Sequence, residues 1–363
     1  MSLVSEPIVS ISKRKIRSII RNPVKSAEAV NLVYVNDSQR GIERRRNGSA
    51  FEYYHKDKKI TDEEELLRIK RLVIPPAWEN VWICPLENGH LQVTGIDVRN
   101  RKQYKYHPMW NALRNHTKFY RLHEFGTALP VLRVKIEKDL SLTGLPVDKV
   151  LATVVSLMER TNIRVGNCSY EKIYGSYGIT TLKDKHVEVS GHSIKFTFKG
   201  KKGVHHDISI KSKRLAKIVK NCQDIPGKEL FQYLDENGER RTIDSGMVNE
   251  YIKNISGGDF TAKDFRTWSG TVQALLAFKE LGFSDTQAET KRNIVAALDV
   301  VSNLLGNTRT VCKKYYVHPL IIGLYESKTL GKYLSQLDEL EEDDGQSGLT
   351  SEEKLLMNIL KTN

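Results

Sequence analysis

The sequence predicts an α+β fold, with a small antiparallel β domain at residues 1–111 followed by a mostly α-helical domain at residues 112–363. Short apolar segments separated by turn residues dominate the chain from Leu32 to Tyr106. Beyond about residue 111, apolar residues recur three and four positions apart, which is the spacing of one helix face. A strictly alternating segment at Ile194–Lys199 interrupts the helices and predicts a β-hairpin insert. A chain of 363 residues is long enough for each domain to bury a core of its own.

The first domain is expected to contain short strands and one helix. The helix, at Asp62–Leu72, is closed by Pro75-Pro76, because proline cannot continue the helical hydrogen bonds. Asn88-Gly89 is a strong turn pair between two of the strands. The strands themselves are expected at Val33–Val35, Phe51–Tyr54, Val81–Cys84 and His90–Val93.

The second domain is expected to be built on long amphipathic helices. One helix carries apolar residues at helical spacing from Val147 to Met158. Another carries them from Ile294 to Leu305, with Ser284 as its N-cap and Gly306 just past its end. In the hairpin insert, the alternating strand meets the tip Gly200-Lys201-Lys202-Gly203, and a second strand returns around Ile208–Ile210. Lys201 is therefore expected at the end of a hairpin.

Composition narrows the class of protein. Hydrophobic residues make up 39% of the chain, which is ordinary for a globular protein and too many for a disordered one. No stretch approaches the apolar length that spans a bilayer, and Met1–Ser10 lacks a secretory apolar region. The cysteines form no CxxC pair, which argues against zinc or a disulfide framework and predicts a cytoplasmic location. They are Cys84, Cys168, Cys222 and Cys312.

The charge balance points to a polyanionic partner. Fifty-seven basic residues against 44 acidic ones give a net charge of +13, and the pI is about 9.4. A basic excess of this size favours nucleic acid, because Lys and Arg release the counterions of the phosphates that they neutralise. The alternative is a soluble surface that happens to be basic. The basic opening Lys13–Arg17 has the same two interpretations, a nucleic-acid-binding arm or a solvated end.

Several kinds of active site are missing from the sequence. It contains no GxxxxGK[ST] loop, no GxGxxG after a strand and no HExxH. The acidic residues gather mainly in the run from Asp338 to Asp344, which is typical of a solvated tail. An ATPase or a two-metal nuclease would need a phosphate-binding glycine loop or converging carboxylates. Chemistry on DNA would therefore depend on cationic side chains and a side-chain nucleophile.

Four segments contain such residues. They are Thr161–Asn167, Lys263–Trp268, Gly306–Thr308 and Cys312–Pro319. Together they resemble the compact type IB DNA topoisomerases of poxviruses and bacteria. Further segments resemble the same family in the same order, and the resemblance extends from about residue 30 to residue 325. These are Ile74–Trp78, Gly89–Gln92, Arg101–Tyr104 and Ser176–Leu182.

The resemblance implies a role for five residues. Tyr316 matches the nucleophile, and Arg164 and Arg266 match the two arginines that hold the scissile phosphate. Lys201 matches the lysine that protonates the leaving 5′ oxygen. Asn307 falls where the poxvirus enzymes have histidine, and bacterial relatives often have asparagine there, so Asn307 is expected to donate a hydrogen bond to a phosphate oxygen.

Two neighbours complicate these assignments. Tyr315 precedes the expected nucleophile directly, and it falls on a family position that is not catalytic. Lys202 is an alternative to Lys201 in the same lysine-rich turn. Each residue taken singly also has a plainer interpretation: a half-buried packing tyrosine, a surface ion-pair arginine, a solvated lysine or a turn asparagine.

The implied reaction is the relaxation of supercoiled DNA by cutting and resealing one strand. A phenol has a pKa near 10 and is a poor nucleophile at neutral pH. Two guanidinium groups can bind the charge that develops on the phosphate oxygens during attack. The product is a 3′-phosphotyrosyl ester close in energy to the bond that it replaces, so no ATP, metal or other cofactor is expected.

The first domain is expected to hold double-stranded DNA. Gln103, Tyr104 and Tyr106 resemble the family's groove and backbone contacts, and glutamine suits an adenine edge. The alternative is that the two tyrosines merely line one face of a strand. Phosphate contacts are expected from Arg101 and Lys102, from the run Arg44–Arg46 with Arg99, and from Lys263 in the second domain. A monomer that closes as a clamp around the duplex would account for the charge of +13.

Two other functions compete with this interpretation. A tyrosine recombinase shares the nucleophile and the two arginines, but recombinases typically have His-x-x-Arg where this chain has Lys263-x-x-Arg266. A non-catalytic DNA-binding protein on the same scaffold would not need to keep Tyr316 and Lys201 together.

Overall fold

A computed structural model describes residues 19, 22–48, 50–98, 102–167, 171, 173–336 and 348–362. It divides into two compact units, Met1–Arg121 and Leu122–Asn363, and the α+β class predicted from the sequence is confirmed. The boundary expected at residue 111 lies inside helix α4 (Pro108–Thr117), so the units divide after this helix. The expected arm at Lys13–Arg17 and the acidic run Asp338–Asp344 lie outside the described residues, as do Arg99, Arg101 and Cys168.

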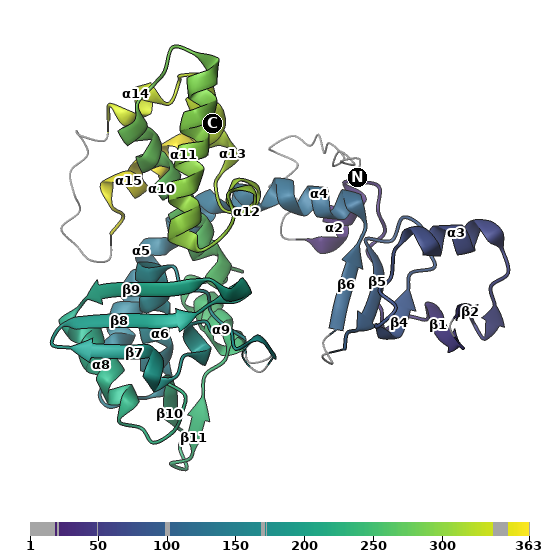
Figure 1. Ribbon diagram of the computed structural model, residues 1–363, viewed down its shortest axis with the longest axis horizontal. Helices are drawn as coiled ribbons and strands as arrows, with labels where there is room; N and C mark the ends of the chain where they lie inside the picture. Colours follow the sequence, from purple (N-terminus) through teal and green to yellow (C-terminus); the bar gives the residue numbers. More distant parts are fainter. Residues whose placement is uncertain are drawn as a thin grey trace. The chain divides into compact units, whose positions relative to one another are not determined.

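The first unit is built around a six-stranded antiparallel sheet in the order β3-β2-β1-β4-β5-β6 (Figure 1). Its core gathers Ile42, Val81, Ile83 and Val93 from three strands under Ile69 of helix α3. The strands are β1 (Ile42–Asn47), β2 (Ala50–His55), β3 (Lys58–Lys59), β4 (Glu79–Ile83), β5 (Leu91–Ile96) and β6 (Lys102–Tyr106), and the helices are α2 (Pro23–Glu28), α3 (Glu63–Arg71) and α4.

Most elements predicted for this unit are confirmed. Strands β2, β4 and β5 and helix α3 lie where they were expected, and the Asp62 side chain caps α3 by accepting from the Glu65 N–H at 2.9 Å. The strand expected at Val33–Val35 is wrong. Val33 forms only an isolated bridge with Gly89, and the side chains of Val33 and Tyr34 are exposed. A run of three apolar residues that pairs with no strand in the described part of the chain thus remains an extended loop.

The second unit combines helices with a small sheet. Figure 1 draws the sheet β7-β8-β9 beside helices α6 and α8, and side chains of both helices share one core with Phe196 and Phe198 of β8. The strands are β7 (Val187–Ser190), β8 (Ser193–Lys199), β9 (His205–Lys211), β10 (Gln232–Leu234) and β11 (Arg240–Thr242). The helices are α5 (Arg121–Leu140), α6 (Val147–Thr161), α8 (Lys213–Gln223), α9 (Ser245–Ser256), α10 (Ala262–Leu281), α11 (Gln287–Leu305), α12 (Arg309–Tyr315), α13 (Pro319–Glu326), α14 (Gly331–Leu334) and α15 (Ser351–Thr362).

The predicted hairpin is confirmed. Strands β8 and β9 pair antiparallel with Phe198 opposite His206, and burial alternates along β8 as the sequence pattern predicts. A single 3₁₀ turn, Lys201–Gly203, joins the strands, so Lys201 begins the hairpin tip. Both of the long helices predicted around Val147–Met158 and Ile294–Leu305 are also confirmed.

The N-cap expected for α11 is wrong by two residues. The helix begins after Thr286, whose hydroxyl accepts from the Glu289 N–H at 3.2 Å. Ser284 instead donates to the Glu289 carboxylate at 2.8 Å, and thus braces the same turn from outside the helix. Gly306 ends α11 in the left-handed region, with φ 56°, as predicted.

The terminal helix α15 belongs to the core of the second unit. Leu355, Leu356 and Ile359 are fully buried. The carboxylate of Glu353 accepts from Trp268 Nε1 at 2.8 Å and pairs with Arg133 at 2.9 Å.

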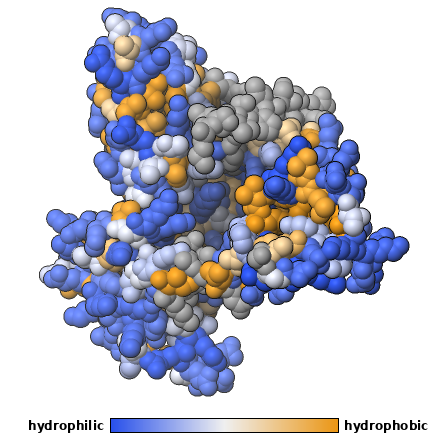
Figure 2. All heavy atoms as spheres, turned by 45° about the vertical axis from the view of Figure 1, so that its right-hand side comes forward, coloured by the Kyte–Doolittle hydropathy of each residue, from blue (hydrophilic) through white to orange (hydrophobic). Residues whose placement is uncertain are grey.

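Among the described helices, none combines the length and the apolar character that crossing a bilayer requires. The face drawn in Figure 2 is mostly hydrophilic, with apolar residues in separate patches.

Candidate active site

Arg164 lies on a short irregular segment directly after helix α6. Asn162 ends the helix in the left-handed region, with φ 56°, and turns the chain away from the helix axis. The Ile179 N–H then donates to the Arg164 carbonyl at 2.8 Å. A Cβ on Gly178 would lie 2.5 Å from Gly166 Cα, so only glycine allows the two backbone segments to approach this closely. The backbone of Arg164 is therefore held by a tight, side-chain-free contact.

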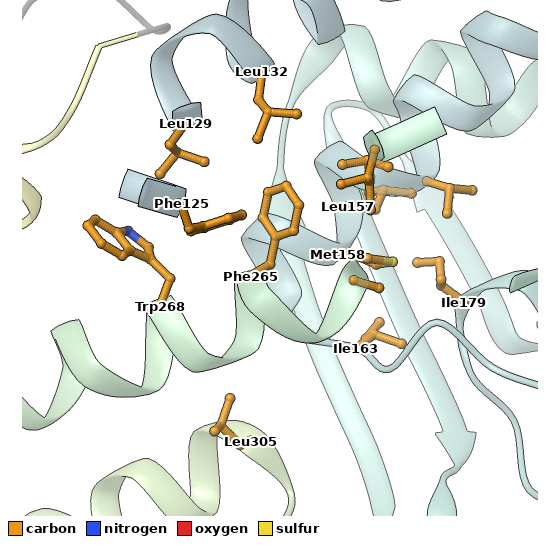
Figure 3. Close-up of a cluster of buried hydrophobic side chains, with 14 of the residues drawn as sticks. Phe125, Leu129, Leu132, Leu157, Met158, Ile163, Ile179, Phe265, Trp268 and Leu305 are labelled. Atoms are coloured by element: carbon orange, nitrogen blue, oxygen red, sulfur yellow. The ribbon is translucent and has the colours of Figure 1, made fainter. Parts of the chain in front are cut away.

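Arg266 is buried on helix α10 and is fixed by backbone carbonyl groups. Its Nη2 donates to Leu305 O at 2.7 Å, and its Nη1 donates to Asn162 O. Phe265 and Trp268 of the same helix anchor α10 in the core, where both rings contact Phe125 of α5 edge-on, as Figure 3 shows. The rigid core thus sets the position of a side chain that is only 6% exposed.

The turn after helix α11 brings Asn307 to Arg164. The Nη2 of Arg164 donates to Gly306 O at 2.8 Å and to Asn307 Oδ1. Among the described residues, four buried side-chain polar atoms have no partner, and two of the four are Asn307 Nδ2 and Arg266 Nε. A buried donor without a partner costs about 1–3 kcal/mol, and such groups concentrate at functional sites. The site therefore offers two donors suited to an anionic oxygen.

Tyr316 directly follows helix α12 and lies beside Arg266. The guanidinium carbon of Arg266 lies 5.3 Å from the centre of the Tyr316 ring. The Tyr316 carbonyl accepts from the Thr271 hydroxyl at 3.2 Å, and the same hydroxyl accepts from the His318 N–H at 3.2 Å. A Cβ on Gly270 would lie 2.9 Å from the Tyr316 carbonyl oxygen. Helix α10 therefore supplies Arg266 and, one turn later, the surface on which Tyr316 rests.

Tyr315 and Tyr316 have different surroundings. The Tyr315 ring lies 5.5 Å from the Lys314 ammonium, on the last turn of α12. The Tyr316 ring lies over the guanidinium of Arg266 and packs against the core of the second unit. Of the adjacent pair, Tyr316 is thus the phenol beside a buried arginine.

Positive charge is concentrated and poorly solvated in this site. Burial, and then the neighbouring Arg266 guanidinium, lower the pKa of Arg164 to about 10. Burial also lowers the pKa of Arg266, and the Tyr316 phenol opposes that change. Both groups remain protonated at pH 7, so two cations lie close together, and no carboxylate of the described residues pairs with either. An anion would relieve their repulsion. Burial raises the pKa of Cys312 to about 11, which leaves its thiol unreactive.

Lys201 approaches the site through its hairpin. Val204 and His206, which follow the tip, lie against Gly306: a Cβ there would be 3.6 Å from Val204 Cγ1 and 2.9 Å from His206 Cε1. The side chain of Lys201 is exposed, as is that of its alternative Lys202. Lys202 has a left-handed backbone, with φ 63°, and Lys201 directly follows Gly200 at the end of β8.

Within the described ranges, no three histidine, cysteine or carboxylate side chains converge as metal ligands.

Four of the residues predicted to contact DNA in the first unit lie on strand β6. Tyr104 and Tyr106 stack with ring centres 6.1 Å apart, so they lie on one face of the strand, as the alternation predicts. Gln103 donates to Asp97 at 2.9 Å, and Lys102 pairs with Asp37 at 2.5 Å. Both side chains would have to exchange an acidic partner for DNA.

Two other predicted contacts have distinct surroundings. Arg44 donates to Pro75 O at 3.1 Å and to Trp78 O, and therefore holds the Ile74–Trp78 segment instead of offering a free charge. Lys263 is exposed in the first turn of α10, three residues before Arg266.

The sequence did not reveal His206, Gly270 or Thr271 as members of the site. His206 shares a strand face with Ile208 and Ile210, and this alternation was a usable signal that its ring is half-buried. Gly270 and Thr271 follow Arg266 by about one helical turn, which places them on the same side of α10. Their contact with Tyr316 joins segments 45 residues apart, and no local pattern encodes it.

Comparisons with known proteins agree on one family. Residues 105–343 match the family described as eukaryotic DNA topoisomerase I, catalytic core, and residues 50–97 match the N-terminal domain of bacterial DNA topoisomerase IB. DNA topoisomerase 1B of Acanthamoeba polyphaga mimivirus is 32% identical over 296 residues, which are 79% of this chain and 88% of that relative. DNA topoisomerase I of Monkeypox virus and DNA topoisomerase 1B of Vaccinia virus (strain Copenhagen) are each 26% identical over 69% of this chain and 77% of their own.

These matches span both units and include all four segments that carry the candidate site. They favour a topoisomerase over a tyrosine recombinase. The chain belongs to the type IB DNA topoisomerase family.

Proposed function

We propose that this protein relaxes supercoiled DNA by cutting one strand through Tyr316, letting the duplex rotate and resealing the cut. The observation that carries the proposal is the meeting of a phenol with two guanidinium groups, those of the half-buried Arg164 and the buried Arg266, which pair with no carboxylate among the described residues. Such a site binds an anion in its ground state, and binds it more tightly as further charge develops.

The cleavage step follows from this arrangement. The Tyr316 oxygen attacks the phosphorus and gives its proton to solvent. Arg164, Arg266 and the Nδ2 of Asn307 bind the non-bridging oxygens, on which negative charge increases in the five-coordinate transition state. Each donor that binds the transition state better than the ground state contributes roughly 3–4 kcal/mol. Because Asn307 already accepts from Arg164 through Oδ1, its amide nitrogen is oriented as a donor.

Lys201 completes the step as the general acid. The bond between phosphorus and the 5′ oxygen breaks, and Lys201 protonates the departing oxygen, which would otherwise leave as an unstable alkoxide. Resealing reverses each transfer. Since a phosphodiester is exchanged for a phosphotyrosyl ester of similar energy, the cycle needs neither ATP nor a metal ion.

The first unit is proposed to hold the duplex. Tyr104 and Tyr106 present a flat aromatic surface with two hydroxyl groups, Gln103 offers an amide to a base edge, and Lys102 offers charge to a phosphate. In the second unit, Lys263 in the first turn of α10 is proposed to contact a phosphate as well. Arg101 is proposed for the same role from the sequence alone. The protein would act as a monomeric clamp on double-stranded DNA, and the cytoplasm remains the expected compartment.

Plasmid relaxation tests the proposal. Wild-type protein is expected to relax negatively supercoiled plasmid in EDTA without ATP, and Tyr316→Phe is expected to lose relaxation by at least about 10³-fold while it still binds DNA. Tyr315→Phe is the matched control and is expected to retain relaxation. Inactive wild-type protein, or an active Tyr316→Phe variant, would refute the proposal. Binding without relaxation or adduct would favour the non-catalytic alternative.

A further inference from the structure

The imidazole of His206 fills a space between two glycines that flank the candidate site. A Cβ on Gly200 would lie 2.6 Å from His206 Nε2, and a Cβ on Gly306 would lie 2.9 Å from His206 Cε1. Gly200 directly precedes Lys201, and Gly306 directly precedes Asn307. One ring therefore touches the backbone on both sides of the site.

The glycine at position 200 is explained by this ring. Its φ of −88° is open to any residue, so backbone conformation does not require glycine there. Glycine is required because any side chain at position 200 would collide with the His206 imidazole. Gly306 differs, because its φ of 56° favours glycine in any case.

Phe198 holds the ring from within the hairpin. It is the cross-strand partner of His206, it is 4% exposed, and the two rings stack with centres 4.8 Å apart and planes 21° apart. Burial, followed by the charges of Arg164, Arg266 and His205, lowers the pKa of His206, so the packed ring is neutral at pH 7.

We infer that His206 is a positioning residue: its ring locks the hairpin tip against the Gly306-Asn307 turn and so holds Lys201 where it can reach the leaving oxygen. The inference rests on the proposed function, because it acts through Lys201. It goes beyond that function in assigning the placement of Lys201 to one packed side chain. The Gly306-Asn307 turn, to which Arg164 donates, is also held by helix α11 itself, because the N–H groups of Gly306 and Asn307 donate to Asn303 O at 3.3 Å and Ser302 O at 3.0 Å. Arg266 is fixed by Leu305 O and Asn162 O, so the loss of His206 is expected to impair leaving-group protonation selectively.

A bridging sulfur substrate separates this role from a general loss of structure. A duplex with a cleavage site mapped for the wild-type enzyme is prepared with sulfur in place of the 5′ oxygen at the scissile bond. A thiol has a pKa near 8.5, so it departs without help from an acid, whereas the natural oxygen needs one. Single-turnover rates of adduct formation are measured at saturating DNA on both substrates.

His206→Ala is expected to cleave ordinary DNA at least about tenfold more slowly than wild type, since general acids contribute about 10²–10⁴-fold. On the sulfur substrate its rate should return to within about threefold of wild type. His206→Phe keeps a ring that can stack on Phe198, and is expected to cleave ordinary DNA faster than His206→Ala. The exposed neighbour gives the matched control: His205→Ala should be within about twofold of wild type on both substrates.

Two further variants calibrate the assay. Lys201→Ala should be slow on ordinary DNA and rescued by sulfur, and Arg164→Ala should be slow on both substrates. Failure of wild type to form any adduct would refute the proposed function itself. If wild type and Lys201→Ala behave as expected, a His206→Ala rate equal to wild type, or a deficit of the same size on both substrates, would overturn the role of His206 alone.

Discussion

His206 also makes the fold sensitive to pH at the level of a single residue. Its pKa is lowered in the folded protein by burial and by Arg164, Arg266 and His205, so between that pKa and the unfolded value near 6.5 the unfolded chain binds more protons. The free energy of unfolding therefore falls as the pH drops below about 6.5.

The His206→Phe variant isolates the contribution of His206 to the pH dependence of the free energy of unfolding. Urea unfolding of both proteins between pH 7.5 and pH 5 should show wild-type stability falling more steeply than that of His206→Phe, because the other titrating groups are shared. Parallel curves, or a steeper fall in the variant, would contradict the assignment of a lowered pKa.

Arg266 tests whether charge alone is enough at its position. Arg266→Lys keeps the charge but loses the planar fork that donates to Leu305 O and Asn162 O. Single-turnover cleavage at saturating DNA is expected to fall by about 10²–10³-fold in Arg266→Lys, and at least as far in Arg266→Ala. Arg214, in a surface pair with Glu137, supplies the control, and Arg214→Ala should cleave at the wild-type rate. Near-normal cleavage by Arg266→Lys would count against a requirement for the guanidinium group at this position.

The residues of the site could be predicted from sequence only as far as ordered motifs reach. Arg164, Arg266, Asn307 and Tyr316 each lie in a recognisable segment, and the structure gathers them around one point. His206 was not predicted, because a histidine on a strand carries no mark of what packs on it. That contact depends on glycines at positions 200 and 306, which leave room for the ring and are distant from each other in the sequence.

At the level of elements, helix α10 is the part of the fold on which the site depends most. It carries Arg266, and its Gly270 lets the backbone of Tyr316 approach within a distance that no Cβ would permit. The amphipathic helices and the hairpin could be predicted because their patterns are local. The N-cap of α11 could not be predicted, because the hydroxyl of Thr286 competes with that of Ser284 for this position. The loop at Val33–Val35 could not be predicted either, because it depends on whether a strand elsewhere in the described chain pairs with it.

Gly270→Ala should displace the nucleophile. The added Cβ would lie 2.9 Å from the Tyr316 carbonyl oxygen and 3.3 Å from Tyr316 Cβ, and both atoms are part of or next to the backbone and cannot rotate away. Cleavage is expected to slow by about 10-fold to 10²-fold with little change in DNA affinity, because a small misplacement of a reacting group is costly.

The control for this change is Gly323→Ala, in the interior of α13. No atom lies within 4 Å of a Cβ placed on Gly323. This variant should keep the wild-type cleavage rate and gain about 0.4–1 kcal/mol in stability. If Gly270→Ala cleaves as fast as Gly323→Ala, the contact does not position Tyr316.

At the scale of the whole molecule, the net charge of +13 should appear as a strong salt dependence of DNA binding. Lys263 is exposed beside the buried Arg266, and is expected to contact a phosphate near the cut. In Lys263→Ala, affinity should fall about equally for different DNA sequences, and the slope of log K against log salt should become shallower by about 1. Lys328, which pairs with Asp285, is the control. An unchanged slope in Lys263→Ala would remove Lys263 from the DNA contacts.

Mass spectrometry of the trapped adduct can show whether Tyr316 exchanges a phosphodiester for a phosphotyrosyl bond. Protein stopped with denaturant during plasmid cleavage is digested with protease and nuclease, and the DNA-linked peptide is sequenced by fragmentation. The expected species is a nucleotide joined through its 3′ phosphate to Tyr316. Attachment at Tyr315 or another residue, a 5′ linkage, or no adduct from an active preparation would contradict it.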